Sequence, residues 1–166
     1  MKSDPDPTSD SVHPFRALWA TGDLGVWLDA LEPDIELHSP AITTPFRGRE
    51  AAAELYGILL EALDDFEIVE ESLAETAYAC LWRANVGGRR IEGADFIRSS
   101  PGGKIAEVRV LIRPLTGISA FASGVGPLLA ARRSRLKAAI VRLFSFPLRI
   151  LFALADIVLP RLLMRR

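Results

Sequence analysis

Two side chains in this sequence have the chemistry for proton transfer, Asp95 and His38. Strand alternation places Asp95 on one face with Gly93 and Ile97, among apolar neighbours. Burial of a carboxyl disfavours its charged form, which raises its pKa and suits it to donate or transfer a proton. The alternative is a carboxylate that is hydrogen-bonded to His38, Arg113 or the backbone and only holds the fold in shape, because a buried carboxyl is costly without a partner.

The other chemically capable side chains favour structural roles. His38 alternates with Leu37 and Ser39, so the direction of its ring is ambiguous, and an exposed or structurally bonded histidine is favoured over a catalytic one. Cys80 lies in an apolar strand and is expected to be inert. The two histidines and one cysteine show no ligand spacing, so we expect neither a metal site nor a cofactor. Without a glycine-rich phosphate loop or a nucleic-acid motif, we expect no nucleic-acid partner.

The elements that position these residues are predicted from apolar spacing and from turn residues. Apolar residues recur at helical spacing in the early segments and alternate as in strands in the later ones. Adjacent glycines at Gly87 and Gly88 supply the positive φ angles of a hairpin turn. Helices followed by a meander of strands indicate an α+β fold with helices on one face of the sheet. We expect helices at residues 15–19, 24–31 and 51–63, a loop at 41–48, and strands at 35–39, 66–73, 78–86, 91–99 and 104–113.

Composition limits the protein to one domain and divides its charge unevenly. The 166 residues accommodate a single domain with a proper core. Residues 132–166 hold nine basic residues and one acidic residue, whereas residues 1–131 hold 11 basic and 20 acidic residues. A single cysteine excludes an intrachain disulfide and allows a reducing compartment, so we expect a cytoplasmic protein. The first 13 residues lack the apolar run of a signal peptide and are expected to be a disordered lead-in.

The C-terminal segment, residues 132–166, is predicted to be a basic amphipathic helical tail. Arg135, Arg142, Arg149 and Asp156 recur every seven residues and share one narrow stripe of a helix that is otherwise mostly apolar. A membrane span is disfavoured, because Arg149 would lie near its midpoint and no uncharged run approaches the ~20 residues that a span requires. A helix lying in the interface of an anionic membrane fits better. The alternative is that the tail packs on the domain or on a second subunit.

Short motifs in a fixed order carry a resemblance over about residues 12–118. They are Thr21-Gly22-Asp23-Leu24, Leu37-His38-Ser39-Pro40, Phe46-Arg47-Gly48-Arg49, and Gly93-Ala94-Asp95-Phe96-Ile97-Arg98 running through Gly103-Lys104-Ile105-Ala106-Glu107 to Arg113-Pro114-Leu115. In this order the chain resembles the nuclear transport factor 2-like superfamily, particularly its SnoaL-like polyketide-cyclase and ketosteroid-isomerase branches. The resemblance implies a cone-shaped α+β barrel: a curved, mostly antiparallel sheet wrapped by three N-terminal helices around an apolar pocket. It also implies a homodimer.

The resemblance implies roles for individual residues. Asp95 falls where the steroid isomerases keep a protonated aspartate that donates to an oxyanion. Their general base, an aspartate just before a proline, is replaced here by Ser39, and their phenolic partner on the first helix by Phe15. The related epoxide hydrolases have an Arg-x-Asp motif where this chain has Gly93-Ala94-Asp95. SnoaL-like cyclases rely on pairs such as His with Asp, which His38 and Asp95 would supply.

Two functions are therefore expected as alternatives. One is a domain that binds an apolar small molecule, as a binder or as an isomerase, cyclase or lyase acting on a polyketide-, steroid- or terpenoid-like ligand, with Asp95 and His38 as catalytic candidates. The other is a non-catalytic, dimerising module that residues 132–166 hold at an anionic membrane surface, the inner face of the membrane. We expect a lead-in at residues 1–13, the domain at 14–118, a linker at 119–131 and the tail at 132–166. The ligand-binding residues are expected to be Phe15, Trp19, Tyr56, Trp82, Val108, Val110 and Ile112.

Overall fold

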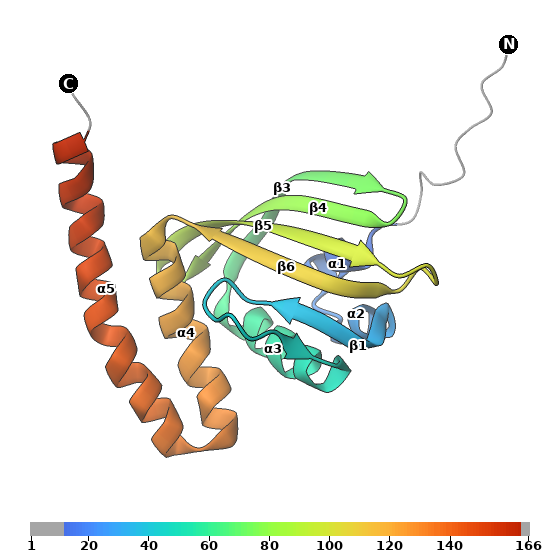
Figure 1. Ribbon diagram of the computed structural model, residues 1–166, viewed down its shortest axis with the longest axis horizontal. Helices are drawn as coiled ribbons and strands as arrows, with labels where there is room; N and C mark the ends of the chain where they lie inside the picture. The colour runs from blue at the N-terminus through green and yellow to red at the C-terminus, as the bar shows by residue number, and fades with distance from the viewer. Residues whose placement is uncertain (1–11, 164–166) are drawn as a thin grey trace, which may run out of the picture.

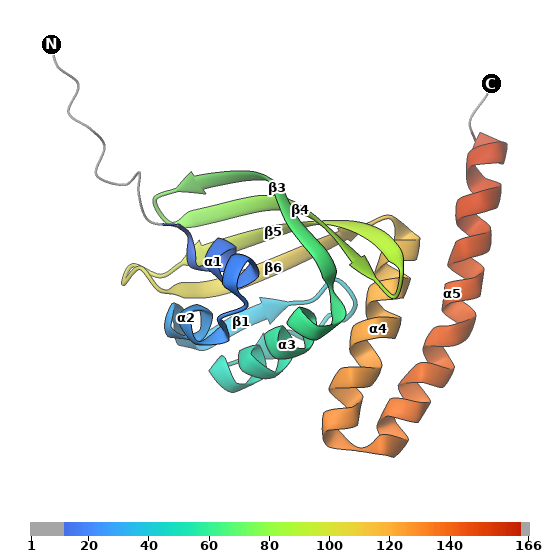
Figure 2. The ribbon, with the colours of Figure 1, turned by 180° about the vertical axis from the view of Figure 1, so that it is seen from behind.

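The structure is a computed structural model that describes residues 12–163, apart from some side chains of the last helix. Figures 1 and 2 show it from two opposite sides. The described chain forms five helices and six strands. Their bounds in chain order are α1 Pro14–Thr21, α2 Leu24–Asp29, β1 Leu31–His38, β2 Phe46–Arg47, α3 Arg49–Ala62, β3 Asp64–Ala74, β4 Ala77–Val86, β5 Arg89–Ser99, β6 Ile105–Arg113, α4 Leu115–Arg133 and α5 Arg135–Leu163.

The first two helices begin at residues whose side chains cap them. His13 caps α1, because its Nδ1 accepts a hydrogen bond from the Phe15 amide at 3.2 Å, and its ring stacks on Tyr78 with centroids 3.9 Å apart. Asp23 caps α2 by accepting hydrogen bonds from amides of the first turn. These two contacts hold His13 in a defined position, whereas the sequence pattern predicts that it belongs to a disordered lead-in. Residues 1–11 of that lead-in lie outside the described residues.

The six strands form one mixed, curved sheet in the order β2-β1-β6-β5-β4-β3. β1 and β6 pair in parallel, and the other neighbours are antiparallel. Helices α1, α2 and α3 cover one face of this sheet (Figures 1 and 2). This arrangement confirms the predicted α+β fold, in which a curved, mostly antiparallel sheet is wrapped by three N-terminal helices and followed by C-terminal helices.

Side-chain alternation determines which strand residues face the helices. In β4 every second residue from Tyr78 to Val86 is buried, and in β5 the same alternation buries Asp95. The register places Asp95 opposite Cys80 on one side and opposite Val110 on the other. The carboxyl of Asp95 therefore lies on the inner, helix-covered face of the sheet.

Two elements at the start of the sheet differ from their predicted bounds. β1 begins at Leu31 rather than at residue 35, and it passes through Pro33. Its pairing with β6 shifts register between Leu31 and Glu36, an irregularity that accommodates a proline, which has no N–H to donate. The predicted loop at 41–48 contains the two-residue strand β2, which pairs with the end of β1.

Residues 119–131, the expected linker, form part of helix α4 and belong to the packed body. The first half of α4 is buried against the sheet and α3, where Phe121 and Val125 join the core. Small residues allow this close packing, since a Cβ at Gly124 would come within 2.8 Å of the Val86 side chain. The apolar and small residues of this helix cover part of the core.

After Ser134, helix α5 turns back and packs along α4, on the side away from the sheet (Figures 1 and 2). No helix among the described residues is both long and apolar enough to cross a bilayer. Residues 164–166 of the predicted tail, and the side chains of Arg149 and Asp156 in its predicted stripe, lie outside what the structure describes. The described part of α5 exposes a row of apolar side chains: Leu136, Ile140, Leu143, Phe144, Ile150, Leu151, Leu154, Ile157, Val158, Leu162 and Leu163.

Candidate functional site

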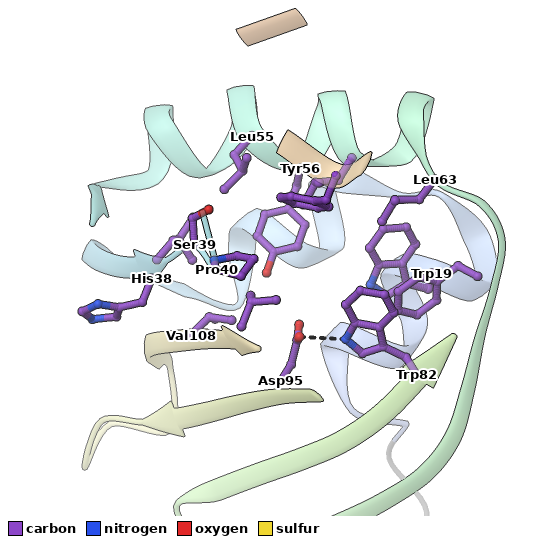
Figure 3. Close-up of a pocket in the computed structure, with 15 residues that line it drawn as sticks. Trp19, His38, Ser39, Pro40, Leu55, Tyr56, Leu63, Trp82, Asp95 and Val108 are labelled. Carbon is purple, nitrogen blue, oxygen red and sulfur yellow. Dashed lines mark hydrogen bonds between the residues drawn. The ribbon is translucent and has the colours of Figure 1, made fainter. Parts of the chain in front are cut away.

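A pocket lies between the inner face of the sheet, helix α3 and the first half of α4 (Figure 3). Its volume is about 40 Å³, whereas pockets for drug-sized ligands measure about 300–1,000 Å³. A steroid-sized ligand must therefore displace part of the wall. The lining residues are Trp19, Leu37, His38, Ser39, Pro40, Leu55, Tyr56, Leu59, Leu63, Phe66, Trp82, Asp95, Val108, Val110 and Phe121.

Asp95 supplies a carboxyl group to an otherwise mostly apolar wall. It is 4 % exposed. Its Oδ1 accepts a hydrogen bond of 2.8 Å from Nε1 of Trp82, which is its hydrogen-bond partner among the described residues (Figure 3). That partner is neither His38 nor Arg113, the two side chains that sequence reasoning had considered. Burial raises the pKa of Asp95 to about 7, although the Trp82 hydrogen bond acts in the opposite direction. Both protonation states are therefore populated near neutral pH.

Trp82 reaches Asp95 because the residue opposite it on β5 is a glycine. The register pairs Trp82 with Gly93, and the indole lies directly over that position: a Cβ on Gly93 would come within 2.1 Å of Cζ2 of Trp82. Gly93 is thus a positioning residue that sequence reasoning missed. The sequence feature that could have indicated this role is a glycine inside a predicted strand, because such a glycine often marks a site where other atoms approach the backbone closely.

Three aromatic rings form one wall of the pocket beside Asp95. Trp19 and Phe66 stack with centroids 3.7 Å apart and planes 8° apart, and Phe66 stacks on Trp82 at 5.1 Å and 29°. Nε1 of Trp19 is buried, and it has no hydrogen-bond partner among the described residues. An unsatisfied buried donor costs about 1–3 kcal/mol, so this N–H is available to a polar atom of a ligand.

Tyr56 contributes a hydroxyl group from the opposite side of the pocket. Figure 3 shows this hydroxyl pointing from α3 toward the carboxyl of Asp95. Burial, and secondarily the negative charge of Asp95, raises the pKa of Tyr56 well above its ordinary value. The phenol therefore remains protonated near neutral pH and can donate a hydrogen bond into the pocket.

His38 points away from Asp95. Figure 3 shows its ring directed out of the pocket, with Nε2 lying 3.2 Å from Glu107 and 3.6 Å from Glu36. Each contact becomes an ion pair only when His38 is protonated, and neither has the alignment of a hydrogen bond. The expected His38–Asp95 pair is not formed, because Leu37 is the buried residue and His38 the outward one at this point of β1.

Two further residues expected to line the pocket lie elsewhere. Phe15 is in the core, where it packs edge-on against Trp19 and Trp27. Ile112 packs against the core from β6 without lining the pocket. The alternation along β6 placed Ile112 on the correct face but did not show where the pocket ends. The other five expected residues, Trp19, Tyr56, Trp82, Val108 and Val110, do line it.

The remaining reactive groups give no second centre in the part of the chain that the structure describes. Burial raises the pKa of the Cys80 thiol to about 12, so that it remains protonated and unreactive. No group of three or more His, Cys, Asp or Glu side chains among the described residues is placed to hold a metal ion. Among the described residues the pocket therefore offers proton transfer at Asp95, and hydrogen bonding at Asp95, Tyr56 and Trp19.

Comparison with known proteins shows a likeness that covers all of the lining residues except Val110 and Phe121. A protein-family model described as the SnoaL-like domain matches residues 12–108, which include Trp19, Tyr56, Trp82 and Asp95. No curated protein matches the chain.

Solved structures share the fold over most of their own lengths. A steroid delta-isomerase from Pseudomonas aeruginosa is 26% identical, with a TM-score of 0.67 over 72% of this chain and 89% of that chain. An uncharacterised protein with a cystatin-like fold from Silicibacter pomeroyi is 22% identical, with a TM-score of 0.61 over 74% and 85%. An epoxide hydrolase/cyclase-like enzyme of pyran ring formation in the polyether salinomycin is 20% identical, with a TM-score of 0.50 over 60% and 84%. The last two likenesses concern the fold alone.

Proposed function

Because this chain belongs to the SnoaL-like domain family, we propose that its pocket binds an apolar small molecule with a carbonyl or hydroxyl oxygen, and that Asp95 acts on that oxygen. The observation that carries the proposal is a buried carboxyl, with a pKa of about 7, in a mostly apolar pocket. Polyketide-, steroid- and terpenoid-like molecules match this description, since they present a large apolar surface and few oxygens. Structures that share the fold include an isomerase and a cyclase-like enzyme.

The proposed chemistry is hydrogen bonding and proton transfer at one ligand oxygen. Protonated Asp95 donates to this oxygen in a site of low dielectric, where such a bond is stronger than in water. The Tyr56 hydroxyl supplies a second donor from α3. Two donors that converge on one oxygen stabilise the negative charge that develops there during enolisation or ring closure. If a proton must also leave carbon, ionised Asp95 is the carboxylate available among the described lining residues.

Native mass spectrometry of the full-length protein, searching for a retained lipophilic molecule, is the first test of this proposal. A titration with 2-acetylnaphthalene, an apolar ketone whose single oxygen can only accept hydrogen bonds, is the second. We expect affinity to fall as pH rises from about 6 to about 8, because Asp95 loses the proton that it donates.

Asp95→Asn should remove this pH dependence, because the amide does not titrate. Glu107→Gln is the matched control, since it changes a carboxylate on the outer face of the sheet. Equal pH dependence in the wild type and in Asp95→Asn would refute a role for Asp95, and absence of binding in both would refute the pocket.

The exposed apolar row on α5 favours a second candidate function, attachment to an anionic membrane surface through residues 132–166. We propose this attachment as the role of the tail, at the inner face of the membrane for a cytoplasmic protein. Its support is the combination of apolar side chains with the described basic residues Arg132, Arg133, Arg135, Lys137, Arg142 and Arg161. Flotation of the full-length protein with phosphatidylcholine vesicles, with and without phosphatidylglycerol, tests it. Equal behaviour with both kinds of vesicle would contradict it.

We further propose that the expected homodimer forms through the outer face of the sheet. Phe96 on β5 and Leu111 on β6 are exposed there. Light scattering should report a dimer that Phe96→Asp converts to monomers. Val26→Asp, at an exposed position on α2, serves as the control. A monomeric wild type would end this proposal without affecting the pocket.

A further inference from the structure

A groove of about 490 Å³, open to solvent, lies where α4, α5 and β2 meet. Phe46 of β2 and Leu129 of α4 contribute apolar side chains to it, and Ile140 and Val141 contribute them from α5. The two helices lie close together beside it, since a Cβ on Gly126 would come within 3.2 Å of Val141. The groove is separate from the pocket around Asp95 and shares no lining residue with it.

Two basic side chains, Arg133 and Lys137, border this groove. Arg133 directly precedes Ser134, the single residue between α4 and α5, and Lys137 lies three residues after it in the first turn of α5, so both are at the turn of the helical hairpin. Neither forms an ion pair with another described residue, whereas neighbouring Arg132 lies 3.9 Å from Glu61. The groove therefore combines an apolar lining with two uncompensated positive charges at one end.

The exposed apolar row of α5 begins beside the groove. Ile140 belongs to both: it lines the groove and is one of the exposed residues of the row. A bilayer surface that contacts the row is therefore adjacent to the groove. Figure 1 shows α5 on the outside of the molecule, where the body of the domain does not block such a contact.

Charge decides between a lipid and a second copy of the chain as the occupant. A second copy that packed along the groove through its own groove would offer Arg133 and Lys137 no acidic partner, because no acidic side chain among the described residues lines the groove, and an unpaired charge in an apolar contact is costly. A phosphodiester instead accepts charge-assisted hydrogen bonds from Arg and Lys. An acyl chain fits an apolar groove and gains from each methylene that it buries.

We infer that the groove between α4, α5 and β2 binds one anionic phospholipid from the membrane surface. The phosphodiester lies between Arg133 and Lys137. One acyl chain follows Leu129, Ile140 and Val141 toward the apolar row. The inference rests on the proposed membrane attachment and adds to it a defined headgroup site, which the pocket chemistry of Asp95 does not require.

Filling the groove without changing charge is the first test, using flotation of the full-length protein with phosphatidylcholine–phosphatidylglycerol vesicles. Ala130 lines the groove, and Ala131, the next residue, is exposed and does not line it. We expect Ala130→Phe to lower vesicle affinity about tenfold by excluding the acyl chain, and Ala131→Phe to leave it unchanged or to raise it. Circular dichroism and melting curves verify that both variants fold.

Removing the two charges is the second test, and it remains decisive if Ala130→Phe does not fold. Arg133→Gln with Lys137→Gln is compared with Arg135→Gln with Arg142→Gln, which removes the same charge from outside the groove. We expect the groove pair to lose about tenfold more affinity than the control pair, and native mass spectrometry to find one phosphatidylglycerol per wild-type chain.

The outcomes separate the headgroup site from the attachment on which it rests. If the wild type does not bind anionic vesicles, the proposed attachment and the lipid site both fail. If it binds, but the groove variants behave like their controls, the site is overturned and attachment depends on the apolar row and diffuse charge alone. Neither result bears on ligand binding by the pocket, which the 2-acetylnaphthalene titration measures independently.

Discussion

At the scale of single residues, the properties of Asp95 depend on Trp82, across the β4–β5 hairpin, and on Gly93, two residues before Asp95 on β5. Burial disfavours the ionised form of the Asp95 carboxyl and raises its pKa, whereas the hydrogen bond from the N–H of Trp82 favours the ionised form and lowers the pKa. The result is a pKa of about 7. Gly93 makes the second effect possible, because it leaves room for the indole to lie over β5. A change in the burial of Asp95, in the Trp82 hydrogen bond or in the space left by Gly93 should therefore change the pH at which the carboxyl titrates.

Gly93→Ala is predicted to displace Trp82 and to raise the pKa of Asp95 above 7. The new Cβ would lie 2.1 Å from the indole, so the ring must move and its hydrogen bond to Asp95 is lost. The overpacking should also destabilise the protein by about 1–3 kcal/mol. NMR titration of the carboxyl and urea unfolding measure the two effects. Gly57→Ala, at a helix position with no close neighbour, is the control. An unchanged titration of Asp95 in Gly93→Ala would contradict this account.

Asp95→Asn is predicted to change the pH dependence of stability. The pKa of Asp95 is about 7 in the folded protein, above its ordinary value of 3.8, so the folded chain binds more protons than the unfolded chain between these values. The contribution of Asp95 to the free energy of unfolding therefore falls as pH rises from about 3.8 to about 7, and it levels off above about 7. Asp95→Asn lacks this slope and should be more stable than the wild type near pH 8, by on the order of 4 kcal/mol at most. Urea unfolding near pH 5 and near pH 8 measures the difference, and parallel slopes would contradict the raised pKa.

Efficient steroid double-bond isomerisation is not expected, despite the 26% identity to a steroid delta-isomerase. The resemblance to the isomerases implies a carboxylate base at the position of Ser39, which lines the pocket, and a phenol at the position of Phe15, which lies in the core. A general base contributes about 10²- to 10⁴-fold, and Asp95 is the single carboxylate among the described lining residues, so we expect little activity even though Tyr56 offers a phenol as a donor. Conversion of a 5-ene-3-ketosteroid, followed by absorbance of the conjugated product, measures this. Robust turnover that Asp95→Asn abolishes would show the prediction to be wrong.

At the scale of elements, α4 closes the pocket and separates it from α5. Phe121 lines the pocket from α4, and the first half of this helix is buried against the sheet. The cavity of about 40 Å³ is too small for a steroid-sized molecule. A shift of α4, or of the Phe121 side chain, is therefore a direct way to enlarge it. Since α5 packs mainly on α4, a surface that binds α5 is mechanically connected to this wall.

Truncation should distinguish the two C-terminal helices. A chain that ends at Arg133 lacks α5 but retains the buried half of α4, so we expect it to remain folded and to lose vesicle binding. A chain that ends at Arg113 also lacks Phe121 and Val125 and should unfold or aggregate, because it exposes the core that α4 covers. Melting curves and flotation provide the measurements. If the chain ending at Arg133 also unfolds, α5 is part of the stable core, and the alternative of packing on the protein is favoured.

At the scale of the whole molecule, positive charge and exposed apolar surface are concentrated at one end. Nine of the 20 Lys and Arg residues lie after residue 131, whereas 20 of the 21 acidic residues precede that point. An anionic surface should therefore attract the hairpin and repel the body. This polarity would orient the protein with α5 toward the membrane.

Vesicle binding is consequently predicted to weaken, without vanishing, as salt rises. The Debye length shortens from about 10 Å at 0.1 M to about 3 Å at 1 M, which screens attraction between the basic residues and the headgroups. Insertion of apolar side chains is not screened and should persist. Flotation across a salt series measures the ratio of the two contributions. Complete release at high salt would exclude an apolar contribution, and no change with salt would exclude the electrostatic one.

The sequence by itself determined many of the elements and the inward residues of the sheet, but it missed β2 and the helix at 119–131. Periodicity and glycine turns predicted the N-terminal helices and the four-strand meander, and short motifs indicated the SnoaL-like fold. Strand alternation placed Asp95 with Val108 and Val110, because the period of two is a local property of the backbone. The apolar content of α5 was equally visible without coordinates.

Only the tertiary structure decided which side chains contact Asp95 and which elements form the wall of the pocket around it. The Trp82–Asp95 hydrogen bond depends on the register of β4 against β5, which pairs residues 13 positions apart. The outward direction of His38 depends on where β1 begins and on its irregular pairing with β6. The helix at 119–131 owes its burial to contact with strands that are distant in sequence. In each case the deciding energy comes from packing between distant segments, which local spacing does not encode.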